Sequence, residues 1–209
     1  MELLLIRHAQ PFRLNDPIGA DPDLTPEGEE QAKRLAAALA DDRYGKVDRL
    51  VSSPMRRAAQ TAGFAREALS LDVATDQRLV ELDHGWTTYG AVDAYTDRSL
   101  LLKDMNGGRL GENTFDPEVF RERVVAGIEE VAAPADVGVV AIVCHGGVIN
   151  AYLSHVIGTA SMFFVEPYYT SVTRVLALEG GHRQVLSVNE IDHLRVRLDG
   201  WPPVIAPRP

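Results

Sequence analysis

Two short apolar runs constrain the fold of this chain more than any other feature, because each ends abruptly at a histidine. Residues 3–6 are followed by Arg7 and His8, and residues 139–144 are followed by His145. Runs of this length and composition are typical of strands buried on both faces of a parallel sheet. In open α/β sheets, ligands bind beside the carboxyl ends of such strands. The two histidines therefore indicate a chemically active site at one edge of a sheet.

Strand-like and helix-like segments alternate between and after these runs. Thr25, Pro26 and Glu27 are typical of a helix start, with a hydroxyl cap, a proline in the first turn and an acid near the positive end of the helix dipole. Further strands are predicted at 47–51, 71–75 and 137–144, and a hairpin is predicted from 172–178 and 184–188. One further helix is predicted to begin at Ser53 and Pro54, and two others are predicted at 117–131 and 148–157. The alternation predicts an α/β fold, a three-layer α/β/α sandwich with a mostly parallel mixed sheet.

The periodic pattern fails between Glu81 and Phe115, where aromatic residues mix with Gly107 and Gly108. We interpret about 86–115 as a loop-rich insert, with room for one helix, that lies over the active site. No linker or repeat divides the rest, so residues 1–209 are predicted to form a single domain.

Charge and composition narrow the possible partners. The 21 basic and 30 acidic residues give a net charge of -9, which disfavours nucleic acid and anionic membrane surfaces. No run approaches the roughly 20 apolar residues of a spanning helix, and the single Cys144 cannot form an intrachain disulfide. We expect a cytoplasmic protein. A homodimer is one possibility for the assembly. We expect either packing within the chain or a dimer contact for four aromatic residues, Phe163, Phe164, Tyr168 and Tyr169.

The predicted strand ends carry residues suited to phosphate. Arg7 with His8, Arg56 with Arg57, and His145 with Gly146 would gather two imidazoles and two guanidiniums around one point, the second guanidinium coming from Arg56 or Arg57. Arginine binds phosphate oxygens in bidentate fashion, and helix N-termini add backbone donors. A neutral histidine can attack phosphorus, and the leaving alkoxide then needs an acid. Glu81 is the best-placed acid, with Asp83 in reserve.

These motifs together resemble the histidine phosphatase superfamily, branch 1, also described as phosphoglycerate mutase-like. The matching segments are Arg7-His8-Ala9, residues 24–28 with Gln31-Ala32, residues 52–62, Glu81 with Gly85-Trp86, residues 111–113, His145-Gly146-Gly147, and Asn189 with His193-Leu194. They span residues 3 to 194 in the family's order, and the match selects Arg57 over Arg56.

The resemblance implies a role for each matched residue. His8 would be the nucleophile that becomes phosphohistidine, and Glu81 would be the proton donor and later the base. The groups that bind the phosphoryl oxygens would be Arg7, Arg57, His145 and Gly146. The family needs no metal and no organic cofactor, and its substrate here would be a phosphorylated small molecule.

Departures from the family pattern favour a phosphatase. Ala9 replaces the motif glycine, and we expect the loop to tolerate it. The mutase pattern after the first motif is absent, although Asn15, offset by one residue, is a candidate phosphate ligand. The insert is also short and only lightly basic. The alternatives are a phosphoglycerate mutase-type phosphotransferase and a catalytically inactive phosphate-binding domain. A metallohydrolase is disfavoured, because no His-x-His or His-Glu-x-x-His spacing occurs.

Overall fold

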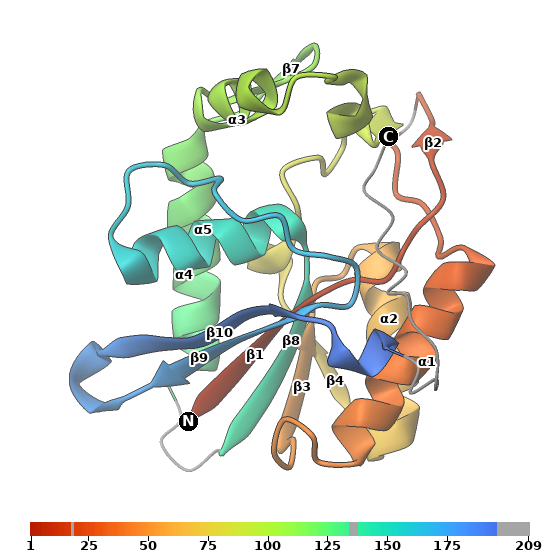
Figure 1. Cartoon of the computed structure of the whole chain (residues 1–209), viewed down its shortest axis with the longest axis vertical. Helices are drawn as coiled ribbons and strands as arrows, with labels where there is room; N and C mark the ends of the chain where they lie inside the picture. Colours follow the sequence, from red (N-terminus) through yellow and green to blue (C-terminus); the bar gives the residue numbers. More distant parts are fainter. Residues whose placement is uncertain (18, 134–137, 196–209) are drawn as a thin grey trace.

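A six-stranded mixed sheet forms the centre of the protein (Figure 1). A computed structural model describes residues 1–17, 19–133 and 138–195. The strands, in their order across the sheet, are β10 (Arg183–Glu190), β9 (Val172–Ala177), β1 (Glu2–Arg7), β8 (Val139–Cys144), β3 (Arg49–Ser52) and β4 (Val73–Thr75). The last four are parallel to one another, while β9 is antiparallel to both β1 and β10. The predicted mostly parallel mixed sheet is confirmed, as is its closing hairpin; Val137, predicted to begin β8, lies outside the described residues.

The register of the central strands places the two histidines side by side. Arg7 at the end of β1 is opposite Cys144 at the end of β8, and the His8 N–H continues the pairing by donating to the Cys144 carbonyl at 2.9 Å. Ser53 extends β3 in the same way, donating to the Val143 carbonyl at 2.9 Å. Three chain segments therefore leave the sheet at the same edge.

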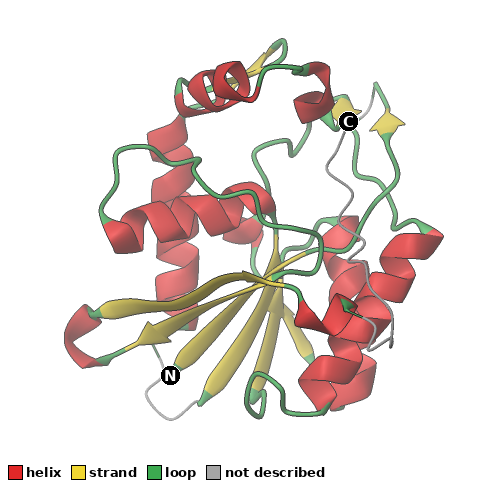
Figure 2. Cartoon of the chain, viewed as in Figure 1, coloured by secondary structure: helices red, strands yellow, loops and turns green. Residues whose placement is uncertain are grey.

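Helices cover both faces of the sheet, as Figure 2 shows. The helices are α1 (Pro26–Ala40), α2 (Arg56–Leu69), α3 (Arg98–Asn106), α4 (Pro117–Val131) and α5 (Gly146–Ile157). Side chains alternate along β1, so that Leu4 and Ile6 pack with α1 and α2, whereas Leu3 and Leu5 pack with α4 and α5. This arrangement is the predicted three-layer sandwich. None of the helices within the described part of the chain has the length and apolar character needed to cross a bilayer.

The helix starts follow local sequence chemistry, with small shifts from the prediction. Thr25 caps α1 by accepting from the Gly28 N–H at 2.9 Å, and Pro26 occupies the first turn. The second helix begins at Arg56 instead of directly after Ser53, because the Ser53 hydroxyl accepts from the Met55 N–H in a preceding turn. The last helix begins at Gly146, two residues before the predicted start.

Residues 86–115 hold only short elements, and they lie beyond the carboxyl edge of the sheet in Figure 1. The short strands are β2 (Leu14–Asn15), which pairs with β5 (Thr88–Tyr89), and β6 (Arg109–Leu110), which pairs with β7 (Asn113–Thr114). Short 3-10 turns cover Gln77–Leu79, Ala91–Ala94, Glu179–Gly181 and Asp192–Leu194. The Asn106 side chain joins α3 to the segment before β9, donating to the Phe163 carbonyl at 3.0 Å and accepting from the Phe163 N–H at 2.8 Å.

Candidate active site

His8 is held as a neutral imidazole directly after β1. Its side chain is almost fully buried, and Nδ1 lies 2.7 Å from the Ala9 carbonyl oxygen. Because a carbonyl can only accept, Nδ1 carries the proton and Nε2 carries the lone pair. Burial, and then the nearby charges of Arg57 and Arg7, hold the pKa of His8 well below its usual 6.5. The residue therefore has the protonation state of a nucleophile at neutral pH.

Ala9, which stands where the family motif has glycine, fits its position without strain. Its backbone φ lies outside the positive range, and its N–H donates to the Thr61 hydroxyl at 3.0 Å. The methyl group is fully buried beside Leu24 and Ala32. The loop therefore accommodates alanine at this position, in line with the expectation from the sequence.

Two arginines enter the site, one from the end of β1 and one from α2, and neighbouring oxygens fix the orientation of both. Arg7 Nη1 donates to the Pro167 carbonyl at 2.6 Å. Arg57, in the first turn of α2, is fully buried and donates from Nη2 to Asp83 Oδ1 at 2.7 Å. Arg56, by contrast, is exposed and pairs with Asp23. The structure thus brings Arg57, and not its neighbour, into the cluster.

His145 completes the cluster from the N-cap position of α5. Its ring centroid lies 5.1 Å from that of His8, and its Nε2 lies 2.8 Å from the Ser53 hydroxyl. When the Ser53 hydroxyl donates its proton to Nε2, the proton of neutral His145 resides on Nδ1, where it is available to a ligand. Burial, and then Arg57 and His8, hold the pKa of His145 well below 6.5.

Three buried nitrogens of this cluster lack hydrogen-bond partners. Among the described residues they are Nε of Arg7, Nε of Arg57 and Nδ1 of His145. Buried polar groups are normally paired, and an unpaired one costs about 1–3 kcal/mol. The N-terminus of α5 at Gly146 adds a positive dipole end beside them. Such a set of donors suits a small anion with several oxygens, as a phosphoryl group is.

Glu81 reaches the cluster from the loop after the 77–79 turn. Its Oε2 accepts from the Gly147 N–H at 2.7 Å, and its Oε1 accepts from the Leu82 N–H at 2.8 Å. Burial, and secondarily the charge of Asp83, raise the pKa of Glu81 above its usual value, despite these two hydrogen bonds. A carboxyl group with a raised pKa is suited to donate a proton near neutral pH. Asp83, the reserve candidate, is instead engaged with Arg57.

Two tyrosines line the cluster, and the sequence interpretation assigned neither of them a definite role. The guanidinium of Arg57 lies 4.8 Å from the Tyr89 ring centroid, and that of Arg7 lies 4.2 Å from the Tyr169 ring centroid. The two hydroxyl groups are 3.5 Å apart. Tyr169 was expected to pack or to form a dimer contact. Its position just before β9, the antiparallel neighbour of β1, was the signal that could have placed it here.

Asn15 is not brought into the cluster. It is exposed on β2, where it pairs with Thr88, and it does not line the cavity described below. Arg13, two residues earlier, does line that cavity and forms an ion pair with Asp93 at 2.7 Å.

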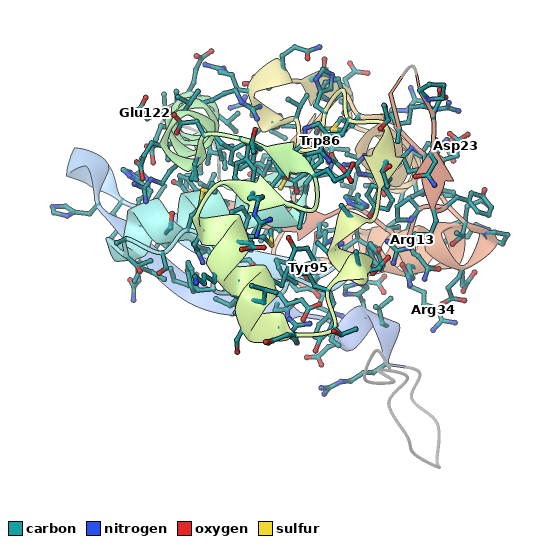
Figure 3. The ribbon with its side chains drawn as sticks, turned by 90° about the horizontal axis from the view of Figure 1, so that it is seen from above. Arg13, Asp23, Arg34, Trp86, Tyr95 and Glu122 are labelled. Atoms are coloured by element: carbon teal, nitrogen blue, oxygen red, sulfur yellow. The ribbon has the colours of Figure 1, made fainter. Side chains whose placement is uncertain are left out.

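A cavity of about 840 Å³ lies above the cluster. It is lined by the catalytic candidates His8, Arg7, Arg57 and Glu81 and by Gly146, but not by His145, and its walls come largely from residues 86–110 and 163–169. In the view from above (Figure 3), Trp86 and Tyr95 lie near the centre of this face, and Arg13 lies to one side. The volume of the cavity falls in the range of about 300–1,000 Å³ that is typical of small-molecule sites. The described residues contain no group of three or more His, Cys, Asp or Glu side chains able to hold a metal ion.

Comparison with known proteins decides the family. The sequence model of the histidine phosphatase superfamily (branch 1) matches residues 3–191. The chain belongs to this superfamily. Membership confirms the resemblance carried by the motifs, and the related phosphatases described next support identification as a phosphatase enzyme.

Related sequences include two from Hydrogenobacter thermophilus. Phosphoserine phosphatase 1 is 38% identical over 90 residues, covering 41% of this chain and 40% of that protein. Putative phosphoserine phosphatase 2 is 28% identical over 202 residues, covering 92% of this chain and 97% of that protein.

Solved structures share the fold over nearly the whole chain. A mutant phosphoserine phosphatase from Entamoeba histolytica, in complex with phosphoserine, superposes with a TM-score of 0.73 at 19% identity, covering 93% of this chain and 99% of that one. A phosphoglycerate mutase from Bacillus anthracis gives 0.72 at 24% identity, covering 92% and 94%. At these identities the similarity establishes the fold, which is phosphoglycerate mutase-like as predicted.

Proposed function

We propose that the protein hydrolyses phosphomonoesters without a metal, through a phosphohistidine formed on His8. One observation carries the proposal: a neutral histidine with its lone pair on Nε2 lies within a cluster of three unpaired buried nitrogens. A histidine in this state can attack phosphorus, and donors fixed in advance stabilise the charge that develops on the equatorial oxygens.

In the first step, Nε2 of His8 attacks phosphorus and the bond from phosphorus to the ester oxygen breaks. Arg7, Arg57 and His145 bind the phosphoryl oxygens during the transfer. The departing alkoxide takes the proton of Glu81, whose raised pKa keeps that proton available. The alcohol leaves, and the phosphoryl group remains on His8.

In the second step, water attacks the phosphohistidine. Glu81, now a carboxylate, accepts a proton from the water as the phosphorus–nitrogen bond breaks. Inorganic phosphate departs, and His8 returns to its neutral form. Each proton is thereby accounted for by a single carboxyl group that acts first as acid and then as base.

Several further features of the chain stay predictions under this proposal. Residues 1–209 would be one domain, with 86–115 covering the active site. The net charge of -9 supports a phosphorylated small molecule as substrate over nucleic acid or an anionic membrane surface. We also propose a cytoplasmic location and a homodimer. A mutase-type phosphotransferase is the alternative; the lightly basic insert and the missing mutase pattern after the first motif favour hydrolysis.

The first experiment is hydrolysis of p-nitrophenyl phosphate in the presence of EDTA. We expect wild-type activity to survive the chelator, and His8→Ala to lose it. His182→Ala is the matched control, because His182 is exposed on the turn before β10 and far from the cluster in sequence and fold. Rapid quenching into base should trap phosphohistidine in the wild type. Full activity in His8→Ala, or activity abolished by EDTA, would contradict the mechanism.

A further inference from the structure

The cavity above the catalytic cluster indicates what kind of alcohol the substrate contains. Resting on the proposed function, we propose that the alcohol portion of the substrate is bulky, uncharged and largely apolar. A group of the size of a fused aromatic ring fits this description, whereas a short chain bearing a carboxylate does not.

The size of the cavity is the first reason. Its volume is about 840 Å³, whereas a water molecule occupies about 30 Å³ of liquid. A phosphorylated three-carbon acid has only about a dozen heavy atoms and would leave most of this space to water. Larger alcohols would displace that water and cover more of the wall.

The second reason is the apolar character of the wall beyond the cluster. Its apolar side chains come from the loop after Glu81, the 91–94 turn, α3, β6 and the segment before β9. They include Leu82, Trp86, Leu101, Leu102, Met105 and Phe163. Leu102 remains 39% exposed. Covering such surface with an apolar ligand is favourable in proportion to the area removed from water.

The third reason is the state of the remaining cations. Besides Arg7 and Arg57 in the cluster, the lining holds two basic side chains among the described residues, Arg13 and Arg98. Each already has a carboxylate partner: Arg13 pairs with Asp93, and Arg98 pairs with Glu166. A carboxylate on the substrate would have to displace one of these partners or lie beside it. Such a site discriminates against anionic alcohols.

The test compares substrates with similar primary alkyl leaving groups, so that proton donation affects them alike. We would measure kcat/KM for 2-(2-naphthyl)ethyl phosphate, ethyl phosphate and 3-phosphoglycerate at constant pH and ionic strength. The naphthylethyl ester should exceed 3-phosphoglycerate by at least 100-fold and should also exceed ethyl phosphate.

Two variants on one helix localise the effect. Leu102→Arg places an unpaired cation in the wall and should shift the substrate preference at least 10-fold toward 3-phosphoglycerate. Leu100→Arg is the matched control, since Leu100 lies on the same helix, is 46% exposed and does not line the cavity. It should leave the preference unchanged. Glu166→Gln, which frees Arg98, should move the preference in the same direction as Leu102→Arg.

The outcomes separate this inference from the function on which it rests. His8-dependent hydrolysis of p-nitrophenyl phosphate together with a preference for 3-phosphoglycerate would overturn the inference and keep the proposed function. Equal effects of Leu100→Arg and Leu102→Arg would also overturn it. Absence of His8-dependent hydrolysis of any ester would overturn both.

Discussion

Replacing Gly147 by alanine should disable Glu81 without unfolding the protein. A Cβ atom built on Gly147 would lie 2.2 Å from Glu81 Oε1 and 3.0 Å from its Cδ. Since non-bonded atoms pack at about 3.5 Å, the carboxyl group must move by more than about 1 Å. The atoms in conflict belong to the end of a flexible side chain, so Glu81 can turn away while the backbone of α5 stays in place.

The size of the effect follows from what the carboxyl group loses. A misplacement of about 1 Å in catalytic geometry can cost about 100-fold, and general acid catalysis contributes about 10²–10⁴-fold. For an alkyl phosphate, kcat/KM should therefore fall by about 10²–10⁴-fold in Gly147→Ala. For p-nitrophenyl phosphate, whose leaving group needs little protonation, the loss should stay below about 10-fold. Stability should change little, because alanine favours a helix by about 1 kcal/mol, which offsets the loss of a hydrogen bond.

Steady-state kinetics with both substrates test this reasoning, and a glycine away from the cavity is the control. Gly63 lies in α2 and does not line the cavity, and a Cβ on it would meet nothing within 4 Å, so Gly63→Ala should retain near-normal activity toward both esters. Adding Gly147→Ala to Glu81→Gln should cause little further loss, since both changes remove the same group. Equal losses for the two substrates in Gly147→Ala, or a loss as large in Gly63→Ala, would refute the assignment of Glu81 as the acid.

Two predictions concern stability. His193 is buried, with Nδ1 facing the Tyr44 hydroxyl at 3.2 Å and Nε2 facing Thr170 Oγ1 at 3.0 Å, and burial lowers its pKa to about 4. The unfolded chain takes up a proton below about pH 6.5 and the folded chain does not, so acid favours unfolding. The free energy of unfolding, measured in urea, should fall by about 2 kcal/mol more between pH 7 and pH 5 in wild type than in His193→Gln; equal falls would contradict this. Asp83→Ala leaves the buried Arg57 without its closest partner and should cost about 3 kcal/mol, partly restored by inorganic phosphate. A cost below about 1 kcal/mol, or no effect of phosphate, would refute that role.

The sheet and its helices were predictable because their signals are local. Strands buried on both faces are apolar throughout, and the first such run already contains the residues that pack on each layer. The cap at Thr25 and the proline after it are local signals for the start of α1. The histidines could be placed at one edge of the sheet because strand ends in parallel sheets share that edge.

The walls of the cavity could not be predicted, because they depend on contacts between distant segments. Arg98 and Glu166 are separated by 68 residues, and Tyr89 and Tyr169 by 80. Neither pairing has a periodic signal in the sequence. The prediction of Asn15 as a phosphate ligand rested on its place after the first motif, whereas pairing of β2 with β5 holds the residue outside the cavity lining.

The catalytic cluster and α3 are held in place by largely different contacts. His8, Arg57 and His145 are held by the backbone at the strand ends and by side chains such as Ser53 and Asp83. Helix α3 is bonded instead to the segment before β9 through Asn106 and Arg98, and to Tyr95 and Arg109 through Asp104. Arg7 shares that segment with α3, since it donates to the Pro167 carbonyl. Side chains of α3 other than these anchors can therefore be exchanged while His8 keeps its tautomer and Arg57 keeps its orientation. Specificity can therefore change by substitution on that helix without loss of the phosphoryl-transfer chemistry.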